Sequence, residues 1–109
     1  RRQRQMCIRD SSTIITSVLQ CMLNVFEYGM TMQESVSKPR FHHQWLPDDV
    51  MFEPKGFDPM VISKLKAKGY VPKEENFVII GRVDAILVEK DGSLEGGADP
   101  RGDDVAVGF

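Results

Sequence analysis

The chain has 109 residues, of which 41% are hydrophobic and 28% are charged, and its formal net charge is −2. This length allows one domain with a core, and the weak charge excludes a general affinity for nucleic acid or anionic membranes. The sequence has no apolar run near the roughly 18 residues of a membrane span, and its two cysteines exclude a disulfide framework.

Residues 1–10 have no apolar periodicity and begin with an arginine-rich stretch. A basic arm that binds nucleic acid is one interpretation. A disordered tail or a sequence-assembly artefact is favoured, and no function is assigned to it. We therefore separate this foreign segment from a single unit over residues 11–109.

A long helix is predicted over residues 12–28, with Ser11 or Ser12 as N-cap and Gly29 at its C-terminal end. Apolar side chains with a 3.6-residue period cover most of its circumference: Ile14, Ile15, Val18, Leu19, Met22, Leu23, Val25 and Phe26. The remaining polar stripe is narrow: Thr13, Thr16, Ser17, Gln20, Asn24 and Glu27. Such a helix is expected to be buried on most sides, against a sheet.

Thr31 and Glu34 form a capping box at the start of a second helix. That helix is expected to end by residue 38, because Pro39 disfavours helical geometry in the residue before it. The stretch 39–49 contains both histidines, the only tryptophan and two prolines. It is predicted to be extended or irregular.

The second half of the chain is predicted to be richer in strands. A third helix over residues 58–69 has Asp58 as N-cap and Gly69 at its end. Strands are expected at 50–53, 70–71, 77–80, 83–89, 93–97 and 105–109, with a polar loop at 72–76. The run 83–89 is apolar on both faces, which is typical of a central strand covered on both sides.

Asp91 and Gly92 predict a two-residue hairpin turn. Gly96 and Gly97 weaken the strand that follows and indicate a close approach of another backbone. Asp99 and Arg101 flank a proline in a predicted turn. They could form a bidentate pair, and an ion pair that only locks the turn is favoured. Together the elements predict an α+β fold with about three helices and a mostly antiparallel sheet.

His42 and His43 lie near Asp48 and Asp49, and imidazole and carboxylate groups are metal ligands. Adjacent side chains of an extended segment point to opposite faces, so both histidines can hardly hold one ion. We predict instead that one histidine is buried and hydrogen-bonded, and that the chain binds no metal or other cofactor.

Nucleophilic chemistry has little support in the residues alone. Cys21 lies in a helix among apolar residues, where thiols are usually inert. Ser11, Ser12 and Thr13 open a helix, where an oxyanion could be received, but capping alone explains them. The sequence has no phosphate loop.

Several short motifs occur in one order along the chain. The longest is PRFHHQWLPD at 39–48, and STIIT at 12–16 and VLQ at 18–20 precede it. It is followed by GF at 56–57, AKGY at 67–70, DG at 91–92, ADPR at 98–101 and VAVGF at 105–109. Together these motifs resemble the small subunit of the γ-glutamyltransferases (glutathione hydrolases).

The resemblance implies part of an N-terminal-nucleophile hydrolase fold, a four-layer αββα sandwich. In this family a threonine freed by self-cleavage attacks the γ-glutamyl amide, and its own α-amine acts as base. The γ-glutamyl group then passes to water or to an amino-acid or peptide acceptor. The implied partners are the rest of the small subunit and the large subunit of the same precursor, in the periplasm or outside the cell.

The resemblance places the catalytic threonine upstream of the match, so no catalytic or substrate-binding residue is expected in this chain. The family's oxyanion hole, a pair of glycines, would fall at Asp10 and Ser11, and Asp10 would repel the developing charge. We therefore expect the genuine sequence to start near residue 11 or 12 and the chain alone to be inactive. The alternative is a non-catalytic interaction module with the same fold. Structural roles are predicted for Ser12, Arg40, His42, His43, Asp99 and Arg101.

Overall fold

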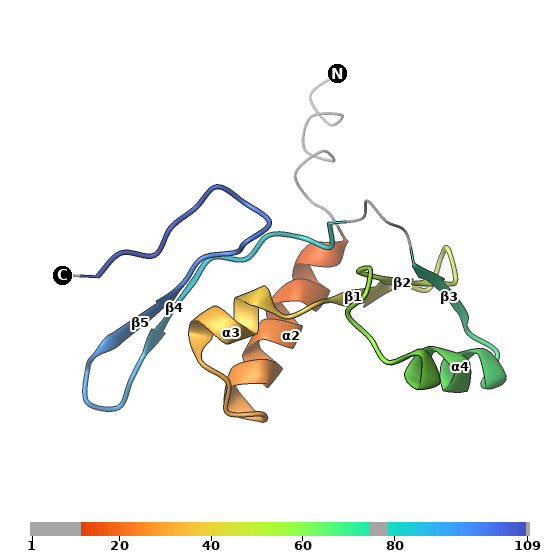
Figure 1. Cartoon of the computed structure of the whole chain (residues 1–109), viewed down its shortest axis with the longest axis horizontal. Coiled ribbons are helices and arrows are strands. Elements are labelled where there is room, and N and C mark those ends of the chain that lie inside the picture. Colours follow the sequence, from red (N-terminus) through yellow and green to blue (C-terminus); the bar gives the residue numbers. More distant parts are fainter. Residues whose placement is uncertain (1–11, 75–78, 109) are drawn as a thin grey trace, which may run out of the picture.

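A computed structural model describes residues 12–74 and 79–108 (Figure 1). The elements are α2 (Thr13–Phe26), α3 (Met32–Ser37), β1 (Phe41–His43), β2 (Asp49–Phe52), α4 (Pro59–Ala67), β3 (Val71–Glu74), β4 (Ala85–Val88) and β5 (Leu94–Gly97). They spread over 47 × 45 × 22 Å with a radius of gyration of 15.9 Å, against about 13 Å for a compact domain of this length. The predicted α+β class is confirmed, but the elements form a flat, open layer.

Helix α2 turns its polar stripe inward and its apolar face outward. Its buried residues are Ser17 and Cys21, whereas Ile15 and Phe26 are 77% and 69% exposed. The expectation that this helix is buried on most sides is therefore wrong for the described chain. Its polar side chains face inward because they find hydrogen-bond partners there, and the apolar face is left without a cover.

This open apolar face predicts that the purified 109-residue chain associates with itself. We expect it to bind 1-anilinonaphthalene-8-sulfonate and to be polydisperse in size-exclusion chromatography with light scattering. The double substitution Ile15→Gln and Phe26→Gln should weaken both signals, and Lys66→Gln on α4 is the control. A monomer that melts cooperatively would contradict the prediction.

Helix α3 begins with the predicted capping box. The hydroxyl of Thr31 accepts from the amide of Glu34 at 3.1 Å, and the Glu34 carboxylate accepts from the amide of Thr31 at 3.0 Å. Met32 and Val36 pack with Cys21 of α2 in a small buried core. Val83, together with Ala85 and Leu87 of β4, packs against this core.

One sheet has the strand order β1-β2-β3, with β1 antiparallel and β3 parallel to β2. Helix α4 is the crossover between β2 and β3 (Figure 1). As predicted, it is capped by Asp58, whose carboxylate accepts from the amide of Met60 at 2.8 Å, and it is followed by Gly69 at φ +92°.

The polar loop expected at 72–76 is wrong for residues 72–74, which belong to β3; residues 75–76 lie outside the described part. Pairing with β2 overrides the polar composition here. The ion pair of Lys73 with Asp49, 2.7 Å between Nζ and Oδ2, joins the two strands.

The other sheet is the β4–β5 hairpin, which turns at Asp91 and Gly92 as predicted. The predicted two-residue loop is wrong, because Glu89 pairs with Ser93 and residues 90–92 form the loop, with Gly92 at φ +87°. Within the described residues β4 pairs with β5 alone, and Ile86 and Val88 are 69% and 67% exposed. The prediction of a central strand covered on both faces is therefore wrong. Its second apolar face is open, as that of α2 is.

The close backbone approach predicted at Gly96 and Gly97 is confirmed at Gly97, because a Cβ there would lie 2.8 Å from the carbonyl oxygen of Met32. At Gly96 the prediction is wrong, because a Cβ there would meet the side chain of Ala106, at 3.1 Å. The predicted strands at 77–80 and 105–109 are absent at 79–80 and 105–108; residues 77–78 and 109 lie outside the described part. None of the helices in the described ranges is long and apolar enough to cross a membrane.

Candidate functional site

Four charged side chains, Arg40, Glu53, Asp99 and Arg101, form a largely buried group that we call the ion cluster. Arg40 Nη2 lies 2.8 Å from Asp99 Oδ2, and Arg101 Nη1 lies 3.0 Å from Asp99 Oδ1. Arg101 also binds Glu53 through two nitrogens. Its Nε donates to Oε1 at 2.7 Å, and its Nη2 contacts Oε2. Arg40 is 1% and Asp99 0% exposed. Two positive and two negative groups thus balance inside the protein, which burial of charge requires.

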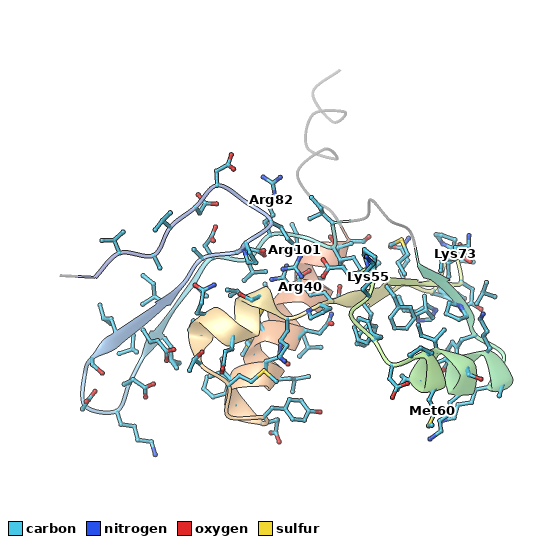
Figure 2. The ribbon with its side chains drawn as sticks, in the orientation of Figure 1. Arg40, Lys55, Met60, Lys73, Arg82 and Arg101 are labelled. Atoms are coloured by element: carbon cyan, nitrogen blue, oxygen red, sulfur yellow. The ribbon has the colours of Figure 1, made fainter. Side chains whose placement is uncertain are left out.

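The ion cluster ties segments that are distant in sequence (Figure 2). Arg40 donates to the carbonyl oxygens of Val36, at the end of α3, and of Gly81 at 2.8 and 3.1 Å. Glu53, directly after β2, accepts from the amides of Arg40 and Ile80 at 2.9 and 3.3 Å. The cluster therefore holds α3, the first sheet and the segment at residues 80–81 in one arrangement.

The hydrogen bonds of the ion cluster favour the charged states of Asp99 and Arg101. Burial acts to raise the pKa of Asp99, but donation from the amides of Arg101 and Val83 and from the side chains of Arg101 and Arg40 outweighs it. The pKa of Asp99 therefore lies below its ordinary value of 3.8. Burial likewise acts to lower the pKa of Arg101, but its hydrogen bonds to Glu53 and Asp99 raise that pKa overall.

The lowered pKa of Asp99 predicts a loss of stability in acid. The pKa of Asp99 is lower in the folded chain than in the unfolded chain, where it is near 3.8. Ionised Asp99 therefore stabilises the fold fully above pH 3.8, and this contribution is lost as the pH falls through the pKa of the folded state. The wild-type chain should lose helical circular dichroism as the pH falls below about 4. Asp99→Asn should be less ordered at pH 7 and show a shallower acid transition, with Asp103→Asn as the exposed control. Superimposable transitions of Asp99→Asn and wild type would contradict the assignment.

The start of α2 is fixed to β1 by polar contacts. The Nδ1 atom of His42 lies 2.8 Å from Thr16 Oγ1, and Nε2 lies 3.4 Å from Ser12 Oγ. One turn later the side-chain amide of Gln20 bonds to the backbone of Phe41. Its Nε2 donates to the Phe41 carbonyl oxygen at 2.8 Å, and its Oε1 accepts from the Phe41 backbone N–H at 3.1 Å. His42 is 2% exposed, so the predicted buried, hydrogen-bonded histidine is confirmed.

A second contact reaches the same part of α2 from the segment at residues 80–81. The Ser17 hydroxyl is shared between the carbonyl oxygens of Thr13 and Ile80, at 2.7 and 3.0 Å. Gly81 has φ +70°, and a Cβ on it would lie 2.6 Å from Ser17 Oγ. Because Arg40 binds the carbonyl oxygen of Gly81, the ion cluster and the start of α2 form one continuous network.

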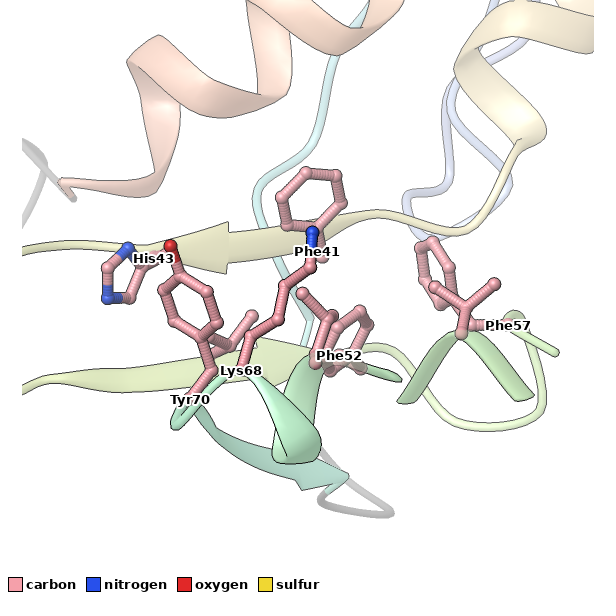
Figure 3. A pocket seen from close by; sticks show the side chains of 9 residues that line it. Phe41, His43, Phe52, Phe57, Lys68 and Tyr70 are labelled. Atoms are coloured by element: carbon pink, nitrogen blue, oxygen red, sulfur yellow. The ribbon is translucent and has the colours of Figure 1, made fainter. Parts of the chain in front are cut away.

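His43 faces away from this network, as alternation along an extended segment predicts. Its Nε2 atom lies 2.8 Å from Asp48 Oδ1, and its ring meets Tyr70 edge-on. It borders an apolar cavity of about 410 Å³ between the first sheet and α4, in which Phe41, Phe52 and Phe57 pack around one another (Figure 3). Among the described residues, no group of His, Cys, Asp and Glu is arranged to hold a metal ion.

The predicted residues thus divide between three places. Arg40, Asp99 and Arg101 meet in the ion cluster, Ser12 and His42 meet at the start of α2, and His43 is separate. Capping by Ser12 is wrong, because its side chain makes no cap hydrogen bond and its hydroxyl turns toward His42; Ser11 lies outside the described residues. The ion pair expected between Asp99 and Arg101 is present. The expectation that it only locks the turn is wrong, because Arg101 also binds Glu53 through two nitrogens and Asp99 also binds Arg40.

Sequence reasoning missed Glu53, Thr16, Gln20 and Gly81. One signal was available for Glu53, since a carboxylate that directly follows an apolar strand must be exposed or find a cation. Thr16 and Gln20 were assigned to the polar stripe of α2, but nothing in that stripe indicated that it faces a strand. For Gly81 the sequence offers only a glycine between two apolar runs.

Comparisons with known proteins match nearly the whole chain. Residues 11–109 match the family profile described as Gamma-glutamyltranspeptidase. The glutathione hydrolase proenzyme of Escherichia coli K12 is 45% identical over 100 residues, which are 90% of this chain and 17% of that protein. The glutathione hydrolase proenzyme of Pseudomonas aeruginosa is 32% identical over 99 residues, 88% of this chain and 17% of that protein.

Solved structures agree with these matches. A mutant of Helicobacter pylori gamma-glutamyltranspeptidase superposes with a TM-score of 0.73 at 39% identity, over 84% of this chain and 50% of that one. The gamma-glutamyltranspeptidase of Pseudomonas nitroreducens superposes with a TM-score of 0.78 at 32% identity, over 90% of this chain and 51% of that one. The open layer is therefore part of an N-terminal-nucleophile hydrolase fold.

The chain belongs to the gamma-glutamyltranspeptidase family. It spans 17% of the length of the curated relatives described above.

Proposed function

We propose that this chain is one segment of a glutathione hydrolase. The whole protein would transfer the γ-glutamyl group of glutathione to water or to an amino-acid or peptide acceptor. Its nucleophile would be an N-terminal threonine outside these 109 residues. The 45% identity to the Escherichia coli glutathione hydrolase proenzyme supports this activity. The partners of the segment would be the remaining parts of the same precursor.

Within that enzyme the segment would hold the oxyanion hole in place. The observation that carries this proposal is the contact of the 39–48 motif with the start of α2, through His42 and Thr16. The family's glycine pair would fall immediately before this point, at Asp10 and Ser11, which lie outside the described residues. Two backbone amides there would stabilise the tetrahedral intermediate only if the following helix keeps them in a fixed position.

The test is a chimera of the Escherichia coli proenzyme in which residues 12–109 of this chain replace the matching segment. The relative's own residues remain ahead of Ser12. We expect self-cleavage into two subunits and hydrolysis of γ-glutamyl-p-nitroanilide. The exposed apolar face of α2 should then be covered by the host, so that the dye binding expected of the isolated chain disappears.

Two matched proteins complete this test. A chimera that begins at Asp10 should fold but lose about a hundred- to a thousandfold in kcat, the usual cost of a damaged oxyanion hole. The isolated 109-residue chain should not hydrolyse the substrate, and robust turnover by it would overturn the placement of the nucleophile elsewhere. A chimera that folds and melts cooperatively but is neither cleaved nor active would favour the non-catalytic interaction module.

A further inference from the structure

We propose that His42 is a positioning residue of the acyl-transfer reaction, and that it acts through the Thr16 hydroxyl on the first turn of α2. This inference rests on the proposed function, because it concerns the oxyanion hole that would precede this helix. His42 touches neither substrate nor nucleophile in the proposal. It sets where the helix start lies.

The first step is the unusual start of α2. Ser12 occupies the N-cap position with helical angles, φ −54° and ψ −17°, and its side chain does not cap the helix. The Ser12 side chain therefore does not fix the helix start as an N-cap side chain usually does. The described contacts that anchor the first turns come from other segments, His42 on Thr16 and Ile80 on Ser17.

The second step is the orientation of the His42 ring. The Gln44 side chain donates its Nε2 to the carbonyl oxygen of Leu46 at 2.9 Å, which turns its Oε1 toward His42 Nε2 at 3.2 Å. An amide oxygen only accepts, so the proton of the neutral ring belongs on Nε2. His42 Nδ1 is then the acceptor, and the Thr16 hydroxyl, 2.8 Å away, is its donor.

The third step follows from the single proton of the Thr16 hydroxyl. Its oxygen also lies 3.0 Å from the carbonyl oxygen of Thr13, in the first turn. The hydroxyl can donate to Thr13 within the helix or to His42 on β1. Donation to His42 couples the first turn of α2 to the sheet, whereas donation to Thr13 stays within the helix and removes this link to the sheet. The proposal is that the bond to Nδ1 holds the helix start in its catalytic position.

The test uses side chains that mimic one ring nitrogen at a time, in the chimera that begins with Ser12. The Oδ1 of an asparagine can replace Nδ1, and the end of a glutamine side chain replaces Nε2. His42→Asn should therefore retain most of kcat, whereas His42→Gln should lose about ten- to a hundredfold, the scale expected of a small misplacement. Thr16→Val should lose kcat to the same extent, and Thr16→Ser should retain it. KM should change little throughout, because these residues do not contact the substrate.

Coupling between the two residues distinguishes positioning from general stability. Combining His42→Gln with Thr16→Val should lower kcat no further than either change alone, because both break one bond. Asn24→Ala is the matched control, since it removes a hydrogen bond from the far end of α2 to Ser35. It should lower the melting temperature without changing kcat per cleaved enzyme.

The outcomes separate this inference from the proposed function. Additive losses in kcat, an unchanged kcat in Thr16→Val, or equal losses in His42→Asn and His42→Gln would overturn the role of His42, while an active chimera would still support the hydrolase. If Thr16→Val does not fold, the comparison of His42→Asn with His42→Gln decides alone. A folded parent chimera without turnover would overturn the proposed function and this inference with it.

Discussion

Replacing Arg40 with methionine is expected to lower the free energy of unfolding of the chimera by about 3–5 kcal/mol. The change leaves the fully buried carboxylate of Asp99 with one ion-pair partner fewer. It also removes the donor to the carbonyl oxygens of Val36 and Gly81. Uncompensated buried charge is among the few causes of single-substitution effects this large. Calorimetry measures the free energy of unfolding of the chimera, and the fraction of the precursor that is cleaved is measured alongside it.

An exposed ion pair in the same chain provides the matched control for Arg40. Lys73 Nζ lies 2.7 Å from Asp49 Oδ2, but the Lys73 side chain is 47% exposed. Lys73→Met should therefore cost less than about 1 kcal/mol. Adding Asp99→Asn to Arg40→Met should cost less than the sum of the two single changes. Equal costs for the exposed and the buried pair would contradict the importance assigned to burial.

Replacing Gly81 with alanine should give the second large effect, about 2–4 kcal/mol. Two causes add here. The backbone at φ +70° is unfavourable for a side chain, and the new Cβ would lie 2.6 Å from Ser17 Oγ and 3.3 Å from Ser17 Cβ. The segment at residues 80–81 would have to move, and it would lose its contact either with Ser17 of α2 or with Arg40 of the ion cluster. The melting temperature of the chimera reports the change.

Two further variants separate the two causes. Gly29 has φ +63° and open space around it, so Gly29→Ala should show the backbone cost alone, about 1–2 kcal/mol. The double variant Gly81→Ala with Ser17→Ala relieves only the closest contact. If Gly81→Ala costs no more than Gly29→Ala, the close approach to α2 contributes nothing.

Local signals in the sequence predicted local structure well. The Thr31–Glu34 capping box and the Asp58 cap depend on side chains within a few residues of the backbone groups that they satisfy. The hairpin turn at Asp91 and Gly92 is equally local, although its loop is one residue longer than predicted. Such contacts are present whatever the chain packs against. The alternation that separates His42 from His43 is equally local.

The predictions failed where contacts between residues far apart in sequence determine the structure. The periodicity of α2 identifies an apolar face but cannot say whether this segment or another part of the protein covers it, and here the polar stripe found Phe41 and His42. Glu53 and Arg101 are 48 positions apart. Their pairing depends on the path of the chain after β5, which brings Arg101 next to the end of β2, and no short pattern contains that path. The same holds for the contact of Gly81 with Ser17.

The ion cluster also bears on the order in which the segment folds. Arg101 binds the carbonyl oxygen of Val36 across 65 positions of sequence, and Arg40 binds that of Gly81 across 41. Closing loops of this length is entropically costly until other contacts have reduced the freedom of the chain. The helices and the hairpin, whose contacts are short-range, are therefore expected to form before the cluster does. Substitutions in the cluster should then speed unfolding far more than they slow folding.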